Sequence, residues 1–168
     1  MEQIHLTEYN QDKDLDNTLR LISLFWKEHN NADTSREDDL KDLADWTVPG
    51  HQLWMVEFAG ETIGFAHMGS RGGEIDWLED LFIMPKYQGR GFGSQVIQLL
   101  EDQVRQYSES LYIEVAARNL HALKLYHRLG YDCLNTLTVR KDFKPENFDC
   151  VSKEIVSGYE LEIRKYKD

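Results

Sequence analysis

The spacing of apolar residues along the chain alternates between the period of a strand and that of a helix. Residues 3–9 alternate between apolar and polar positions, which predicts an edge strand. Residues 14–29 carry one apolar stripe at helical spacing. A shorter helix is predicted over 35–46, with Ser35 as its N-cap. A Pro-Gly pair then ends this helical part of the chain.

Four strand-like stretches and one helix are predicted in the middle of the chain. Residues 52–58 and 62–68 are joined by a short turn and predict a hairpin. Residues 75–83 predict a third strand. Apolar positions over 94–107 follow helical spacing, and 111–116 is a short stretch rich in β-forming residues.

The C-terminal third has a less regular pattern. We expect Asn119 to cap a helix that ends near Gly130, because these residue types favour the two ends of a helix. Residues 134–140 and 158–164 are expected to form a final strand pair. The stretch 141–157 between them is too long for a tight hairpin and is expected to be a loop with a functional role.

These elements predict one α+β domain over residues 1–168, because no repeat, low-complexity tract or linker divides the chain. The helix after residue 93 is expected to join two parallel neighbours. The central sheet is therefore predicted to be mixed and flanked by helices. A chain of 168 residues can bury such a core without disulfides or a metal.

Composition narrows the classes of function. Hydrophobic residues make up 41% of the chain and charged residues 29%, as in an ordinary soluble globular protein. Cys133 and Cys150 fit no metal-ligand spacing, so no metal is expected. They are also too few for a disulfide framework, so we expect a cytoplasmic location. The sequence has no apolar export region, and no apolar run approaches the ~20 residues of a membrane span.

The net charge of −11 argues against a nucleic-acid partner, whose phosphates require Lys and Arg. The same charge is compatible with a cationic small-molecule substrate, because negative potential concentrates cations near the protein. It is also what keeps many proteins soluble, so charge alone does not choose between the two interpretations.

The densest chemical signal is the turn Gln88-Gly89-Arg90-Gly91-Phe92-Gly93, between a predicted strand and a predicted helix. Glycines allow positive φ and a close approach of ligand to backbone. At a helix N-terminus, free N–H groups and the helix dipole favour an anion such as a pyrophosphate. The G-x-G-x-G spacing fits neither a Walker loop, which ends in Gly-Lys-Ser/Thr, nor the G-x-G-x-x-G of dinucleotide-binding folds.

The pattern Q-x-x-G-x-G, one turn after a strand that ends at Pro85, resembles the pyrophosphate loop of the GNAT acyltransferases. Residues 111–131 resemble the second signature of that family: a strand, a helix that begins at Asn, a Tyr, then Leu-Gly-Tyr. The resemblance covers most of the chain. It implies the GNAT acyl-CoA N-acyltransferase fold and an N-acetyltransferase activity with acetyl-CoA as cosubstrate.

The resemblance also implies a set of cofactor-binding residues. The strand segment 81–83 would pair its main chain with the amide-rich pantetheine arm, and one of its N–H groups would stabilise the developing oxyanion. The N–H groups of 89–94 would hold the pyrophosphate. The residues implied are Leu81, Phe82, Ile83, Gln88, Gly89, Arg90, Gly91, Phe92, Gly93, Ser94, Asn119 and Tyr126.

Acetyl transfer needs a neutral amine, and an alkylamine with a pKa near ~10 is protonated at neutral pH, so a carboxylate has to take a proton. Glu79 is the first candidate base and Glu114, on the next predicted strand, is the second. Strand alternation predicts that Asp80 points away from Glu79. The alternative for each carboxylate is a solvated or ion-paired side chain.

The leaving thiolate needs a proton, which a phenol can supply. Tyr126, seven residues after Asn119 and on the same helix face, matches the general-acid Tyr of the family. A core Tyr and a simple N-cap are the alternatives for these two residues. The six histidines show no paired spacing, and His121 and His127 are expected to face solvent.

The segment WLEDLFIMPKYQGRGFGS (77–94) resembles the spermidine/spermine and related small-amine acetyltransferases. This implies that Glu79 and Asp80 bind a cationic amine substrate. Aminoglycosides, peptide N-termini and protein lysines are alternative acceptors, and a catalytically silent acyl-CoA-binding sensor is an alternative of another class. The acceptor, the choice between Glu79 and Glu114, the role of 141–157 and the oligomeric state, a homodimer included, stay open.

Overall fold

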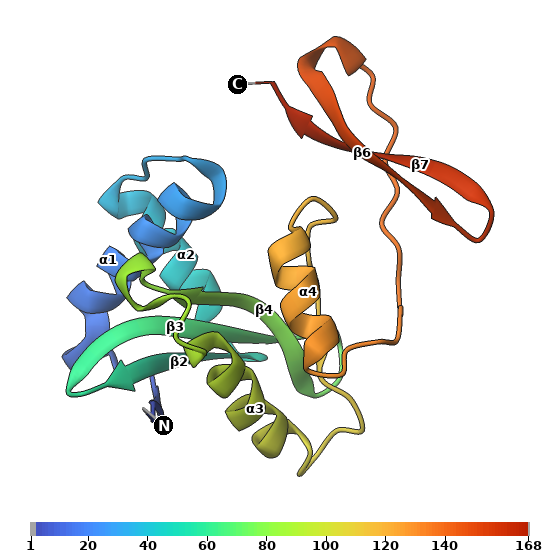
Figure 1. The fold of residues 1–168 in the computed structure, drawn as a ribbon. Coiled ribbons are helices and arrows are strands. Elements are labelled where there is room, and N and C mark those ends of the chain that lie inside the picture. The colour runs from blue at the N-terminus through green and yellow to red at the C-terminus, as the bar shows by residue number, and fades with distance from the viewer. Residues whose placement is uncertain (1–2, 168) are drawn as a thin grey trace. The chain divides into compact units, whose positions relative to one another are not determined.

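The computed structural model describes residues 3–167. By the contacts between their backbones, the residues divide into two compact units, one ending at Glu114 and the other beginning at Val115. Figure 1 shows the course of the chain through both units. The single domain predicted over residues 1–168 stays a prediction.

A mixed sheet forms the centre of the first unit, and within residues 3–114 it has five strands (Figure 1). β1 to β4 pair as antiparallel neighbours, whereas β4 and β5 are parallel and are connected through a helix. The predictions of a mixed sheet and of an edge strand at the N-terminus are confirmed. The strands, in spatial order, are β1 (His5–Glu8), β2 (His51–Phe58), β3 (Glu61–Ser70), β4 (Ile75–Ile83) and β5 (Tyr112–Ile113).

Helices α1 (Gln11–Asn30) and α2 (Arg36–Trp46) begin at side-chain caps. At α2, Ser35 accepts a hydrogen bond from the Asp38 N–H while the Asp38 carboxylate accepts one from the Ser35 N–H, which forms a capping box. The ring of Phe25 on α1 contacts the rings of Phe65 and Phe82 from the sheet. The central part of β3 is buried on both of its faces, so the core lies on both sides of the sheet.

Helix α3 (Phe92–Val104) starts two residues earlier than predicted, because Gly91 in the left-handed region serves as its N-cap. Its buried side chains include Val96, Ile97 and Leu100. Strand β5 is shorter than the predicted 111–116 and pairs only with the first half of β4. Within residues 3–114, this short pairing leaves the second half of β4 without a strand partner on that side.

The second unit contains helix α4 (Leu120–Arg128) and the hairpin β6 (Phe148–Val156) and β7 (Tyr159–Tyr166). Asn119 caps α4 and Gly130, with a φ of 98°, follows its end, as predicted.

The prediction of a strand at 134–140 is wrong, and 141–157, predicted as a loop, contains the whole of β6. The reason lies in the turn between β6 and β7. Ser157 and Gly158 both have positive φ, 51° and 86°, and form the kind of two-residue turn that fixes a hairpin register. The sequence signal was this Ser-Gly pair.

Candidate functional site

One edge of β4 is paired over only its first half. β5 pairs with Trp77 and Leu78, whereas β3 pairs with β4 as far as Ile83. Within residues 3–114, the main chain of 79–83 therefore has no strand partner on the β5 side. An unpaired strand edge is a template for another extended chain that carries amides.

Residues 81–83, predicted to hold the pantetheine arm, lie on this unpaired part of β4. Phe82 and Ile83 are buried and Leu81 is half-buried, so their side chains serve the core and any ligand contact is left to the main chain. The Ile83 carbonyl accepts a hydrogen bond from Nε2 of Gln88 at 2.8 Å. Gln88 thus fixes the start of the glycine turn to the end of the strand.

The glycine turn leads from β4, through the 3₁₀ turn η1 (Pro85–Tyr87), into α3. Gly89 and Gly91 have φ angles of 74° and 82°, which L side chains rarely adopt. A Cβ on Gly89, Gly91 or Gly93 would meet no atom within 4 Å, so the turn is open on its outer side. The helix has no side-chain cap, which leaves its first N–H groups and its dipole to an anion.

The remaining turn residues hold the turn in place. Glu61 accepts hydrogen bonds from Lys86 at 2.7 Å and from the Tyr87 hydroxyl at 2.5 Å, and these bonds, that of Lys86 first, lower the pKa of Glu61. The Arg90 guanidinium lies over the rings of Phe58 and Phe92, at 5.0 and 4.9 Å from their centres. Phe92 itself is buried, and Ser94 follows in the first turn of α3.

A β-bulge in β4 places Glu79 and Asp80. Opposite β4, His67 pairs with Asp80 and the next residue, Met68, pairs with Leu78, so Glu79 is the extra residue. Asp80 bonds His67, and the Glu79 side chain lies against the position of a Cβ on Gly69. His67 and Gly69 share one face of β3. Glu79 and Asp80 therefore also share that face, and the expectation that they point to opposite faces is wrong because the bulge interrupts the alternation.

The two candidate bases meet at one arginine. Arg71 bonds Glu79 through Nε (3.3 Å) and an NH2 nitrogen (2.9 Å), and the same nitrogen lies 2.7 Å from Oε2 of Glu114. The guanidinium carbon is 4.1 Å from the centre of the Trp77 ring. Hydrogen bonds to Glu79 first, and to Glu114 second, raise the pKa of Arg71. This is the ion-paired arrangement that the sequence left open as an alternative.

Arg71 and His67 were not among the residues predicted for the site. Both are brought to Glu79 and Asp80 by the pairing of β3 with β4, and no short motif records that pairing. The sequence predicted these strands as two successive stretches, 62–68 and 75–83, and predicted neither their pairing nor its register.

Asn119 and Tyr126 belong to the second unit. The Asn119 side chain accepts a hydrogen bond from the Ala122 N–H at 3.1 Å, which is an N-cap interaction. The Tyr126 ring lies 6.2 Å from that of Tyr131, and burial raises the pKa of the Tyr126 phenol above its ordinary value of 10.0. His121 and His127 are exposed, as expected. The catalytic role of Tyr126 stays a prediction.

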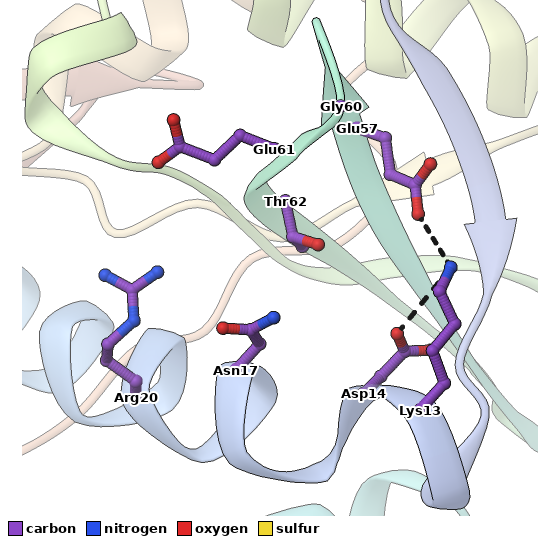
Figure 2. Close-up of a pocket in the computed structure, with 8 residues that line it drawn as sticks. All are labelled: Lys13, Asp14, Asn17, Arg20, Glu57, Gly60, Glu61 and Thr62. Atoms are coloured by element: carbon purple, nitrogen blue, oxygen red, sulfur yellow. Dashed lines mark hydrogen bonds and ion pairs between the residues drawn. The ribbon is translucent and has the colours of Figure 1, made fainter.

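A polar pocket of about 390 Å³ lies between α1 and the β2–β3 hairpin (Figure 2). Within the pocket, the Lys13 ammonium lies 3.1 Å from the Glu57 carboxylate and 4.0 Å from that of Asp14, so these charges largely neutralise one another. None of the predicted site residues lines it. The lining residues are Lys13, Asp14, Asn17, Arg20, Glu57, Gly60, Glu61 and Thr62.

Two further properties of residues 3–167 bear on function. No group of three or more His, Cys, Asp or Glu side chains is placed to hold a metal ion in this part of the chain. None of its helices combines the length and the apolar character needed to cross a bilayer.

Two curated proteins resemble part of the chain. An uncharacterized N-acetyltransferase of Escherichia coli K12, YjgM, is 28% identical over 91 residues, which is 52% of this chain and 54% of that protein. The spermine/spermidine N(1)-acetyltransferase of Bacillus subtilis 168 is 29% identical over 84 residues, 44% of this chain and 55% of that protein. The chain thus spans about half the length of these relatives.

The fold is shared with solved structures. The aminoglycoside N-acetyltransferase AAC(6')-Iy, solved in complex with CoA, superposes with a TM-score of 0.66 at 16% identity, covering 85% of this chain and 97% of the other. At this identity the likeness concerns the fold. The family model described as the acetyltransferase (GNAT) family matches residues 18–131, which is more than half of the chain and includes β4, the glycine turn and α4. The chain belongs to the GNAT acetyltransferase family.

Proposed function

We propose that the protein transfers the acetyl group of acetyl-CoA to a primary amine. The observation that carries this proposal is the continuity of two features: the main chain of 79–83 is unpaired on one side, and it leads directly into an open glycine turn at the N-terminus of α3. The first suits an arm that contains amides, and the second suits the pyrophosphate at the end of that arm.

The residues of the turn and strand would bind and orient the thioester. N–H groups of 89–94 would hold the pyrophosphate, and the main chain of 81–83 would pair with the pantetheine arm. An N–H of the same segment, aimed at the thioester carbonyl, would stabilise the oxyanion that forms when the amine attacks. Backbone donors of this kind are fixed before the reaction, so they cost no reorganisation during it.

Glu79 and Glu114 are the candidates that would take the proton from the incoming ammonium group. The neutral nitrogen would then attack the thioester carbon, the C–S bond would break, and the CoA thiolate would take the proton of the Tyr126 hydroxyl. The acylated nitrogen would lose its second proton to solvent, and the Tyr126 phenolate would regain a proton from solvent. The products are an N-acetylated amine and CoA. The raised pKa of Tyr126 supports its part, because a general acid must enter the reaction protonated.

The acceptor we propose is a cationic small molecule, polyamine-like or aminoglycoside-like. Glu79 and Asp80 on one face supply two carboxylates, and the Trp77 ring already carries a cation, the Arg71 guanidinium. A relative that acts on spermine and spermidine, and the aminoglycoside enzyme with the same fold, support this class.

The experiment is a measurement of CoA release from acetyl-CoA with spermidine, spermine, an aminoglycoside, and peptides with a free N-terminus or a single lysine. We expect turnover with the polycationic small molecules. Turnover with peptides alone would favour a peptide or protein acetyltransferase. Tight acetyl-CoA binding without turnover on any amine would instead identify an acyl-CoA-binding sensor.

A further inference from the structure

Three side chains from three neighbouring strands form one hydrogen-bonded chain in the first unit. Nδ1 of His51 on β2 lies 2.8 Å from Nε2 of His67 on β3. Nδ1 of His67 lies 2.9 Å from Oδ2 of Asp80 on β4. Nothing in the reaction proposed above uses either histidine.

His67 is the central member of this hydrogen-bonded series and is held rigidly. It is 3% exposed, and its ring stacks on that of Trp46 at 4.8 Å and 18°. The His51 ring, 5.0 Å away and inclined by 19°, meets it edge to edge through the hydrogen bond. The titratable groups in contact with it are His51 from β2 and Asp80 from β4, and α2 contributes the uncharged Trp46. A buried ring fixed by two hydrogen bonds and one stacked indole cannot turn over without opening the core.

The two hydrogen bonds fix where the protons sit. A carboxylate only accepts, so Nδ1 of His67 carries the proton that it donates to Asp80. In a neutral His67, Nε2 is then an acceptor, and Nδ1 of His51 must donate to it. A further proton would enter at Nε2 of His51 and place a positive charge on the His51–His67 pair, next to Asp80.

The Asp80 carboxylate is also placed to contact a ligand. Its side chain is 23% exposed, so the carboxylate contacts His67 and still reaches the surface. It lies on the same face as Glu79, where the proposed acceptor would bind.

We propose that His67 is a positioning residue that holds the Asp80 carboxylate toward a cationic acceptor, and that a proton on the His51–His67 pair weakens the hold on that acceptor. The inference rests on the proposed function, since it concerns the amine site of that reaction. When the pair is neutral, Asp80 presents its full negative charge. When the pair is protonated, its positive charge offsets the negative charge of Asp80, and cations bind less tightly.

Histidine is the side chain that changes charge between pH 5 and 8. Over the same range an alkylamine with a pKa near ~10 stays protonated, so a change in its affinity reports the protein and not the ligand. Binding of spermidine to the complex of the protein with CoA, measured by calorimetry from pH 5.5 to 8 at constant ionic strength, tests the inference. Wild-type affinity should fall by about tenfold toward pH 5.5, the scale of one neighbouring charge.

Two variants separate positioning from packing. His67→Phe keeps a flat ring in the stack but loses both hydrogen bonds, so it should bind spermidine several-fold more weakly at pH 8 and with little pH dependence. His67→Gln can still donate one N–H to Asp80 but cannot titrate, so it should restore affinity at pH 8 and stay insensitive to pH. Acetyl-CoA affinity should be unchanged in both variants, because neither touches the glycine turn.

A second measurement is independent of the acceptor. Long-range ¹H–¹⁵N spectra of the free protein should show the proton of neutral His67 on Nδ1, and Asp80→Asn should change that tautomer. A proton on Nε2 of neutral His67 overturns the inference, as does a pH dependence of spermidine binding that is the same in all variants, or no spermidine binding at any pH. Absence of turnover with every amine would refute the proposed function and not this inference.

Discussion

The carboxylate of Glu79 lies against the backbone of Gly69: a Cβ added to Gly69 would stand 2.9 Å from Oε1 of Glu79. Gly69 is paired with Trp77 across the β3–β4 ladder, next to the bulge that carries Glu79. The missing side chain is the space into which Glu79 folds to reach Arg71. Glycine at this position therefore permits the present place of the Glu79 carboxylate, although its φ is not in the left-handed region.

Gly69→Ala is expected to displace Glu79. Its Cβ would force the carboxylate away from its present place, so kcat/KM should fall about tenfold or more for every amine, since misplacing a catalytic group by about 1 Å can cost 10²-fold. Steady-state kinetics and acetyl-CoA affinity are the measurements, and acetyl-CoA affinity should not change. Gly73→Ala is the matched control, because a Cβ there meets nothing within 4 Å. Wild-type kcat/KM in a folded Gly69→Ala protein would mean that the position of Glu79 is unimportant.

A cationic acceptor that bound at Glu79 and Glu114 would have to compete with Arg71, which already pairs with both carboxylates. Arg71→Gln should lower the KM for spermidine several-fold, because it frees two carboxylates. Arg71→Lys keeps the positive charge but loses the two-point contact with Glu79, so it should lower the KM less. The pair with Glu114 is exposed, with 45% and 56% of the two side chains open to solvent, so stability should change by less than about 1 kcal/mol. Kinetics at fixed acetyl-CoA and thermal unfolding test both statements. A raised KM would instead show that Arg71 organises the site.

The anion site at α3 can be tested by charge at constant size. Gly93 has no positive φ and open space around it, so both Asp and Asn fit there. Gly93→Asp should weaken acetyl-CoA binding about tenfold or more relative to Gly93→Asn, because it adds negative charge where a pyrophosphate would bind. Equal acetyl-CoA affinities in the two variants, measured by calorimetry, would show that the pyrophosphate does not bind at this turn. Gly91→Asp should weaken binding further, because Gly91 has positive φ.

Tyr126→Phe is expected to lower kcat far more than it changes KM, by roughly 10²–10⁴-fold as for other general acids. Burial raises the pKa of Tyr126 above 10.0, so the phenol keeps its proton at every pH below that value and loses it only above. Wild-type kcat should therefore show no loss assignable to Tyr126 up to pH 9.5. A wild-type kcat in the Phe variant would make Tyr126 a packing residue.

Signals local in sequence were predictable and those set by strand pairing were not. Ser35 and Asn119 were found as caps because the capping interaction lies within three residues of each. The common face of Glu79 and Asp80 depends on a bulge that only the register with β3 defines. His67 bonds partners 16 and 13 residues away, so its chain had no local signature.

Most of the acidic side chains of α2 have structural partners. Asp38 closes the capping box, Asp39 accepts from Thr34 at 2.6 Å, and Asp42 accepts from the Trp26 indole at 2.6 Å. These contacts explain three of the acidic residues of α2, and no bound ligand is needed to explain them. Attraction of a polycation is therefore expected to depend mainly on Glu79 and Asp80.

Glu79→Gln separates the two roles of Glu79, and ionic strength separates local from long-range attraction. As the base, Glu79 is needed for every amine, so the Gln variant should lower kcat for monoamines and polyamines alike. As a ligand, it should mainly raise the KM of spermidine and spermine. Attraction between charges is screened beyond roughly 10 Å at 0.1 M salt, so kcat/KM for spermine should fall with added salt more than for a monoamine of similar length. Rates for both amines should be measured from 20 to 500 mM salt. If salt and Glu79→Gln act equally on both amines, the acceptor is not selected by its charge, while the acetyl transfer itself would still stand.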